Sequence, residues 1–284
     1  MSFTIGLAQI DPVLGNLQEN VAKHVRAAER ARRENADLVV FPELSLTGYS
    51  TKDLTRDLAV NMSVPATALN PLLEMSKTVS IVAGGVEEDS SYRLYNSAFL
   101  FEEGTVRSVH RKIYPPTYGM FEEMRYFSPG TSLRIHHSRV GVLGILICED
   151  LWHITLPYLL AQQGAQVIIG LVASPTRLSG DQQRLEIATA NAENHRAYAR
   201  LLSSYIVFCN RTGFEDGVGF WGGSSVTGPD GSQITNAKYF EEDLVFARIE
   251  DQELRRARQL SRHFLDDDPR FLLNELSRFG SNRA

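Results

Sequence analysis

The sequence predicts a single α/β domain built on mixed β-sheets. Short apolar runs rich in β-formers alternate with longer segments of helical periodicity, a pattern typical of helices that cover sheet faces. The runs 94–101 and 105–110 are separated only by Glu102-Glu103-Gly104, which predicts a hairpin and therefore an antiparallel pair. At 284 residues and 43% hydrophobic content, the chain is long enough for one large core.

The predicted strands are short, mainly apolar runs bounded by polar or glycine-containing segments. The first begins almost at the N-terminus, and the run 140–148 is an apolar stretch that stops at a cysteine. In chain order we expect strands at 3–9, 37–41, 79–84, 94–101, 105–110, 140–148, 166–170, 206–210, 224–228 and 244–249.

The predicted helices lie between these strands and show helical spacing of their apolar residues. In chain order we expect them at 18–34, 65–77, 156–163, 182–203 and 251–260. We find no internal repeat and no low-complexity segment.

The tail is expected to form an extension (261–284) beyond the predicted domain (1–260). It contains Asp266-Asp267-Asp268-Pro269 and several apolar residues that need to be covered: Phe264, Phe271, Leu272, Leu273, Leu276 and Phe279. Either a neighbouring subunit or the chain's own domain could cover them.

Composition excludes several classes of function. The net charge is −5 with a pI near 5.8, and basic residues are scattered among acidic ones, so nucleic acid is not an expected partner. The N-terminus lacks the pattern of a secretory signal, and no apolar run reaches the roughly 18 residues of a membrane helix. We therefore expect a cytoplasmic protein that does not bind membranes.

Two cysteines occur, Cys148 and Cys209, so a disulfide framework is not expected and at least one thiol is available for chemistry. The seven histidines are scattered without the spacing of metal ligands, and His136-His137 reads as a polar strand end. The sequence therefore predicts neither a metal nor an organic cofactor.

Cys148 is the candidate nucleophile, because its apolar strand stops there and Glu149-Asp150-Leu151-Trp152 follows as a turn. A nucleophile on such a turn is held rigidly, and the next backbone N–H groups point toward a developing oxyanion. A buried inert thiol is the alternative. Cys209 has no adjacent charged pair and is interpreted as a core residue.

Glu43 follows a buried strand within Phe41-Pro42-Glu43-Leu44. Its apolar neighbours favour partial desolvation, which suits a carboxylate to proton transfer near neutral pH. Lys112 follows another strand and enters a loop rich in proline and aromatic residues, where a fixed ammonium would stabilise an oxyanion. Taken separately, the glutamate also fits a backbone-capping acid and the lysine a solvated surface residue.

Together these segments resemble the nitrilase superfamily of carbon-nitrogen hydrolases and its Glu-Lys-Cys triad. The matching motifs are Phe41-Pro42-Glu43, Arg111-Lys112 followed by Tyr118-Gly119-Met120-Phe121-Glu122-Glu123, and Cys148-Glu149-Asp150-Leu151-Trp152. The resemblance implies a four-layer α-β-β-α sandwich that commonly dimerises. It also implies that Cys148 is the nucleophile, Glu43 the base and Lys112 the stabiliser of the tetrahedral intermediate. Glu123, or Glu122 if the loop register shifts, would orient substrate or Lys112.

Within this superfamily, the motifs resemble most the glutaminase domain of glutamine-dependent NAD synthetases. That resemblance implies a small polar amide such as glutamine, in a pocket lined by Tyr49, Tyr118, Phe121, Glu149 and Ser174, with Trp221 closing over it. Packing and helix-capping roles are the alternatives for these residues, and a structural turn for the glycine-rich loop of Trp221.

The sequence departs from the synthetases in its loop residues, because Val172 replaces a usual asparagine and Asp181 a basic residue that is often present. The chain also ends without room for their second, ATP-using domain, so we expect a free-standing amidase or an ammonia-supplying subunit. The other candidates are a nitrilase, an N-carbamoyl amidohydrolase, an N-acyltransferase and a non-catalytic binding protein.

Overall fold

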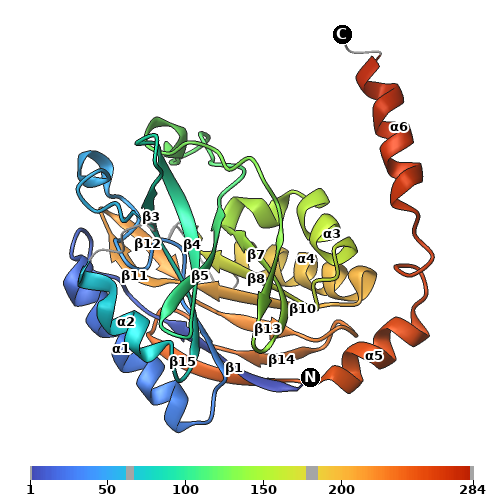
Figure 1. Ribbon diagram of the computed structural model, residues 1–284, viewed down its shortest axis with the longest axis horizontal. Helices are drawn as coiled ribbons and strands as arrows, with labels where there is room; N and C mark the ends of the chain where they lie inside the picture. Colours follow the sequence, from blue (N-terminus) through green and yellow to red (C-terminus); the bar gives the residue numbers. More distant parts are fainter. Residues whose placement is uncertain (1, 62–66, 177–184, 282–284) are drawn as a thin grey trace.

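Two six-stranded β-sheets packed face to face form the centre of the protein, with helices on both outer faces (Figure 1). The computed structural model describes residues 2–61, 67–176 and 185–281. The inner sheet faces meet in one apolar core, and each outer face packs against helices, which gives four layers in the order α-β-β-α. The predicted fold class, a sandwich with mixed sheets, is confirmed.

The first sheet has the strand order β15-β1-β2-β3-β4-β5. Its pairs β1–β2 and β2–β3 are parallel and the others are antiparallel. The predicted hairpin is present as β4 and β5, and its turn contains Glu103 and Gly104, both with positive φ. The strand bounds are β1 (Phe3–Gln9), β2 (Leu38–Val40), β3 (Ser80–Glu88), β4 (Leu94–Glu102), β5 (Thr105–Arg111) and β15 (Asp243–Ile249).

The second sheet has the order β14-β13-β10-β8-β7-β6 and repeats the same plan. Its pairs β10–β8 and β8–β7 are parallel, and antiparallel strands flank them. The bounds are β6 (Ile135–Ser138), β7 (Gly141–Ile147), β8 (Val167–Val172), β10 (Tyr205–Asn210), β13 (Ser225–Thr227) and β14 (Gln233–Asn236). A small third sheet joins β9 (Pro175–Thr176), β11 (Thr212–Glu215) and β12 (Val218–Trp221).

Two pairs of helices cover the sandwich. Helices α1 (Leu17–Arg33) and α2 (Asn70–Met75) pack on the first sheet, and α3 (Thr155–Gln162) and α4 (Glu186–Leu202) pack on the second. The amphipathic α1 begins after Asn16, whose side-chain oxygen accepts a hydrogen bond from the backbone N of Glu19 at 3.0 Å. These helices seal the outer sheet faces from water and leave the strand ends to carry polar residues.

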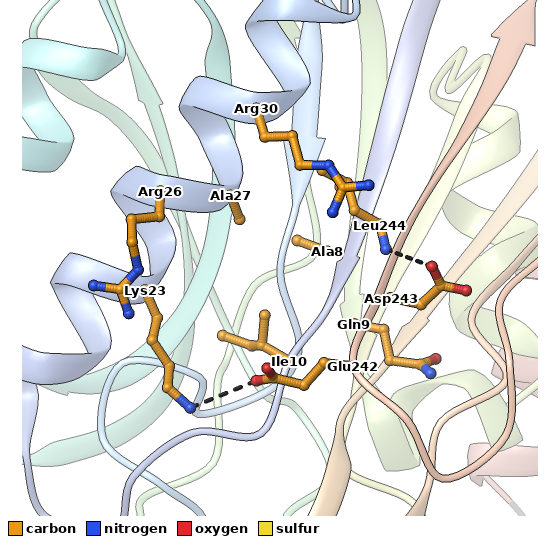
Figure 2. A pocket seen from close by; sticks show the side chains of 10 residues that line it. All are labelled: Ala8, Gln9, Ile10, Lys23, Arg26, Ala27, Arg30, Glu242, Asp243 and Leu244. Carbon is orange, nitrogen blue, oxygen red and sulfur yellow. Dashed lines mark hydrogen bonds and ion pairs between the residues drawn. The ribbon is translucent and has the colours of Figure 1, made fainter.

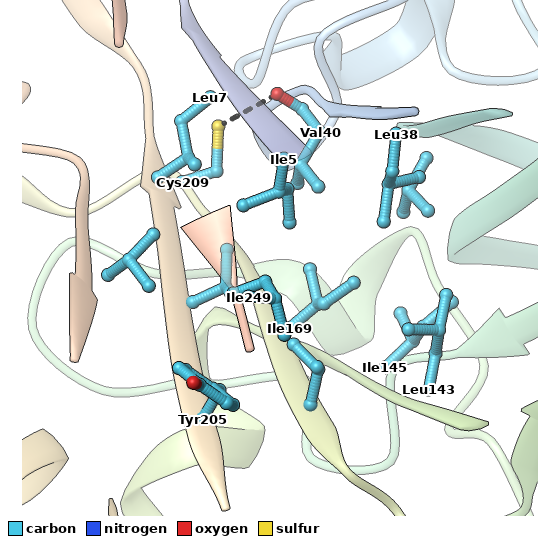
Figure 3. Packing of buried hydrophobic residues seen from close by; sticks show 14 of the residues in the cluster. Ile5, Leu7, Leu38, Val40, Leu143, Ile145, Ile169, Tyr205, Cys209 and Ile249 are labelled. Atoms are coloured by element: carbon cyan, nitrogen blue, oxygen red, sulfur yellow. Dashed lines mark hydrogen bonds between the residues drawn. The ribbon is translucent and has the colours of Figure 1, made fainter. Parts of the chain in front are cut away.

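The core between the sheets consists mainly of aliphatic side chains (Figure 3). Cys209 lies inside it with no exposed surface, and its Sγ is 3.2 Å from the carbonyl oxygen of Val40. The prediction that Cys209 is a core residue is confirmed. Both cysteines are free thiols, as the sequence led us to expect.

The structure adds elements that the apolar pattern does not reveal. The edge strand β14 is polar and largely exposed, and β11 and β12 lie in a glycine-rich stretch, so neither shows a strand-like apolar run. Strands β6 and β9 were not predicted either. The predicted helix 65–77 is shorter, comprising a 3-10 turn (Thr67–Leu69) and α2, and residues 65–66 and 182–184 of two predicted helices lie outside the described residues.

The tail forms two helices, α5 (Asp251–Leu260), as predicted, and α6 (Pro269–Ser281), which was not predicted. Figure 1 shows α6 standing away from the sandwich. Phe264 packs against the α3–α4 layer, so the chain's own domain covers that residue. Four of the six apolar tail residues named above remain more than half exposed: Phe271, Leu273, Leu276 and Phe279.

Candidate active site

The ends of three strands bring the predicted catalytic residues together. Glu43 follows β2, Lys112 directly follows β5, and Cys148 directly follows β7. The Nζ atom of Lys112 lies 2.7 Å from Oε1 of Glu43, and the charges of both residues act on the thiol of Cys148. Two strands of one sheet and one strand of the other therefore meet at a single cluster.

The loop that carries Glu43 lies unusually close to β3. A Cβ atom added to Gly84 would lie 2.5 Å from the backbone N of Leu44 and 2.9 Å from Cα of Glu43, closer than real atoms approach. Leu44 itself has a φ of 48°, a conformation that costs a non-glycine residue roughly 1–2 kcal/mol. Glycine at position 84 therefore gives the carboxylate its place against the sheet.

A buried ion cluster surrounds Lys112. Its ammonium donates to Oε1 of Glu43 at 2.7 Å and to Oε1 of Glu123 at 2.6 Å, and all three residues are at most 4% exposed. Glu122, the alternative second glutamate, is exposed and pairs with Arg125 at 3.9 Å. The structure thus places Glu123, and not its neighbour, beside the lysine.

Neutral hydrogen-bond donors complete the cluster. The side chain of Asn96 donates to Glu43 at 2.8 Å and to Glu123 at 3.3 Å, and the backbone N–H of Ala173 donates to Oε2 of Glu43 at 2.9 Å. The hydroxyl of Tyr49 donates to Glu123 at 2.6 Å. Tyr49, predicted as a substrate contact, is therefore bound to the second glutamate, and its role toward a substrate stays a prediction.

Cys148 occupies a constrained turn. It is half-buried, has a φ of 44° and begins a 3-10 helix (Cys148–Trp152) directly after β7. Asp150 fixes this turn, because its carboxylate accepts hydrogen bonds from the backbone N–H groups of Ile147, Ile113 and Tyr114 at 3.0–3.2 Å. His110 lies 3.1 Å from the same carboxylate. One buried acid thus ties the loop after Lys112 to the cysteine turn.

The electrostatics of the cluster keep the thiol protonated. Burial and the negative charge of Glu43 raise the pKa of Cys148 well above its usual value, and the opposing effect of Lys112 is smaller. Burial works against the ammonium of Lys112, but Glu123 and Glu43 together raise its pKa. Burial also raises the pKa of Glu123, against the effect of Lys112. A neutral thiol therefore stands beside carboxylates and an ammonium.

The predicted pocket residues fall into two groups. Tyr118 is exposed, donates to Oε2 of Glu149 at 2.6 Å and contacts Phe121 edge-on, with ring centroids 5.6 Å apart. Ser174 and Trp221 are buried, and the indole N–H donates to the serine Oγ at 3.0 Å. Glu149 directly follows the cysteine, so the first group adjoins the nucleophile. Trp221 packs within the α3–α4 layer and supports Ser174, and its contact with substrate stays a prediction.

Sequence reasoning missed several members of the cluster: Asn96, His110, Asp150 in its bonding role, and the N–H of Ala173. The available signal was polar residues inside otherwise apolar strands, as in Tyr95-Asn96-Ser97 of β4. Asp181, one of the noted departures, lies outside the described residues.

Other features of the described part of the chain lie apart from this chemistry. A hollow of about 260 Å³ lies between α1 and the strands β1 and β15, and none of the predicted site residues lines it (Figure 2). Its Lys23 already bonds the carbonyl of Asp11 at 2.6 Å. The described residues contain no cluster suited to a metal ion and no helix long and apolar enough to cross a membrane.

Comparison with known proteins agrees with the geometry. Residues 4–259 match the family model described as "Carbon-nitrogen hydrolase". The chain is 32% identical over 254 residues to the glutamine-dependent NAD(+) synthetase of Acinetobacter baylyi, covering 89% of this chain and 45% of that protein. It is 31% identical over 256 residues to that of Thermotoga maritima, covering 88% and 43%. The chain thus spans less than half the length of these relatives.

Solved structures give the same picture. The glutamine-dependent NAD+ synthetase of Acinetobacter baumannii is 30% identical, with a TM-score of 0.79 over 89% of this chain and 47% of that chain. A carbon-nitrogen hydrolase from Helicobacter pylori is 23% identical, with a TM-score of 0.86 over 97% and 98%. This second match shows that the fold extends over nearly the full length of both chains.

Proposed function

The chain belongs to the carbon-nitrogen hydrolase family and is an enzyme of that superfamily, and from this premise we propose that it hydrolyses a small amide through a thioester on Cys148. One observation carries the proposal. The buried Lys112 ammonium is held between Glu43 and Glu123, beside a half-buried cysteine on a turn with positive φ. This arrangement supplies a nucleophile, a base and a fixed positive charge at one place.

In the proposed first step, Glu43 takes the proton of the Cys148 thiol while Sγ attacks the amide carbonyl carbon. The raised thiol pKa makes such a base necessary, because little thiolate exists beforehand. Lys112 uses two of its three N–H donors on the carboxylates, which leaves the third for the oxyanion, together with a backbone N–H near Glu149.

The intermediate then collapses in two stages. Glu43 returns its proton to the leaving nitrogen, the C–N bond breaks, and ammonia or an amine departs to leave a thioester on Cys148. Water next gives a proton to the same carboxylate and attacks the thioester carbon. The C–S bond breaks, the sulfur regains a proton, and the carboxylic acid leaves. Glu123 and Tyr49 act in this scheme by holding Lys112 in place.

We propose a glutamine-like amide as substrate. The relatives at about 30% identity are named glutamine-dependent, and the carboxylate of Glu149, next to the nucleophile, is available to a substrate ammonium. Tyr118 and Phe121 adjoin that carboxylate and would flank the same ligand. A carbamoyl compound or a nitrile would use the same thiol, so the acyl group has to be measured.

We also propose that the chain forms a homo-oligomer in the cytoplasm and that ammonia passes to an acceptor enzyme. The exposed apolar residues of α6 support contact with a second copy, since the chain's own domain leaves them uncovered. The synthetase relatives support ammonia transfer. Light scattering of the intact chain and of Leu276→Glu would test the contact, because a charge on that face should shift the protein toward monomer.

The central test is ammonia release from a panel of amides, carbamoyl compounds and nitriles. Release from glutamine that is abolished in Cys148→Ala would support the proposed substrate. Release from another compound would keep the mechanism and reject glutamine. Intact-protein mass spectrometry of the wild type, quenched during turnover, should detect an acyl adduct on Cys148, and the absence of both ammonia and adduct for every compound would refute the proposal.

A further inference from the structure

Asn96 links the two buried glutamates. It lies in β4, is 1% exposed, and its Nδ2 atom donates to Oε1 of Glu43 at 2.8 Å and to Oε2 of Glu123 at 3.3 Å. Its backbone carbonyl accepts the N–H of Lys112 at 2.9 Å. Asn96 thus contacts both glutamates that pair with Lys112, and also the backbone of Lys112 itself.

The other end of the same amide is unsatisfied. The Oδ1 atom of Asn96 is buried and has no hydrogen-bond partner in the described part of the chain. A buried acceptor without a donor lowers stability, so such groups are rare in protein interiors. The side-chain amide of Asn96 is therefore oriented with its N–H donors toward the two carboxylates, although its oxygen is then left without a partner.

The charges explain that orientation. Glu43 and Glu123 carry two negative charges and Lys112 supplies one positive charge, so the buried cluster holds an excess of one negative charge. Burial already raises the pKa of Glu123. Hydrogen bonds from an uncharged donor favour the ionised form of a carboxylate without adding a charge that would compete for the thiol.

We propose that Asn96 is a positioning residue that holds the carboxylates of Glu43 and Glu123 correctly spaced around Lys112 and, through its two hydrogen bonds, favours the ionised state of the cluster on which proton transfer from the thiol depends. The proposal rests on the function proposed above. Three other titratable groups face these carboxylates. They are Tyr49 in the loop after β2, Lys112 at the end of β5 and Cys148 in the cysteine turn.

The neighbouring Ser97 provides a matched control. It is equally buried on the same strand and donates to a glutamate, Oε2 of Glu87, at 2.6 Å. That glutamate pairs with Arg111 and not with Lys112. Ser97→Ala therefore removes a buried hydrogen bond to a carboxylate without touching the cluster, and it should leave the pH profile unchanged.

The test compares Asn96→Ala, the near-isosteric Asn96→Asp and Ser97→Ala. In Asn96→Ala we expect kcat to fall about ten- to a hundredfold, KM to change less than about threefold, and the acid limb of the kcat profile to move up by about one pH unit. Asn96→Asp should move the limb further, because it adds a third carboxylate. Circular dichroism would establish that each variant is folded.

Alkylation of Cys148 by iodoacetamide provides a readout that needs no substrate. Because the thiol loses its proton beside the same carboxylates, the pH dependence of its alkylation should change in both Asn96 variants and stay as in the wild type in Ser97→Ala. A folded Asn96→Ala or Asn96→Asp with wild-type pH dependence in alkylation would overturn the proposal. Failure of the wild type to hydrolyse any amide would instead reject the proposed function, and the alkylation profiles would still decide the role of Asn96.

Discussion

Removal of the buried ammonium should destabilise the protein in a pH-dependent way. In Lys112→Met, the carboxylates of Glu43 and Glu123, which lie 2.7 and 2.6 Å from Nζ, lose the cationic partner that they share while remaining at most 4% exposed. Breaking a buried ion pair by removing one partner costs about 3–5 kcal/mol, because it leaves an uncompensated charge. We therefore expect a loss of up to about that size at pH 8.

The sign of the pH dependence follows from Glu123. Its pKa is already raised by burial, against the lowering effect of Lys112, and loss of the lysine should raise it further. A carboxyl group whose pKa is higher in the folded state binds more protons than in the unfolded state, so stability falls as the pH rises from the unfolded value of 4.5 through the folded one. The deficit of Lys112→Met should consequently be small near pH 5 and grow toward pH 8.

Urea denaturation followed by circular dichroism at pH 5, 6, 7 and 8 measures this directly. Glu123→Gln combined with Lys112→Met should recover part of the loss at pH 8, because one of the two unpaired charges is removed. A destabilisation that is the same at every pH would show that lost packing, and not unpaired charge, is responsible. If the double variant recovered none of the stability lost at pH 8, the same conclusion would follow.

Three further results are expected. Gly84→Ala should lower kcat/KM about a hundredfold, because the new Cβ displaces the loop that carries the proposed base. In Gly85→Ala the new Cβ meets only side chains, at 3.2–3.3 Å, so the effect should be smaller. Equal effects of the two substitutions would show that displacement of the backbone near Glu43 is not the cause. Iodoacetamide should modify Cys148 at a rate that still rises above pH 9, since burial raises the pKa of this thiol. Peptide mapping should find the fully buried Cys209 unmodified. A modification rate that reaches its plateau below pH 8 would indicate a preformed thiolate at Cys148. Asp150→Ala should lower the free energy of unfolding by about 2 kcal/mol or more, because the buried backbone N–H of Ile147 and the partly buried N–H groups of Ile113 and Tyr114 lose their acceptor. An unchanged thermal midpoint would contradict that role.

The parts of the fold that could be predicted are those whose burial leaves a periodic apolar pattern. Strands β1 to β5 and the central strands of the second sheet show such runs, and so does α1. The edge strand β14 does not, because it is polar and largely exposed. Helix α6 has apolar residues at helical spacing, but it lies in the tail, which the sequence analysis treated as an extension beyond the last element.

The candidate site also contains residues that the sequence reveals and residues that it does not. Glu43, Lys112 and Cys148 each follow a strand directly or nearly so, and that position is visible in the sequence. The position of Asn96 inside an apolar strand marks it as unusual, but the sequence does not say which groups its side chain contacts. Its role depends on two carboxylates that lie 53 and 27 positions away along the chain. Such a contact follows from the sheet register and not from any motif.

The excess negative charge of the cluster explains why the enzyme would need a base at all. If Lys112 dominated, the thiol of Cys148 would ionise in the resting protein and react with any electrophile that reached it. Instead, burial and Glu43 outweigh the lysine and raise the thiol pKa. In the mechanism proposed above, Glu43 would then generate the nucleophile as a carbonyl accepts sulfur, and Lys112 would stabilise the oxyanion that forms. We infer that the two carboxylates around one ammonium make the resting thiol less reactive than a preformed thiolate would be.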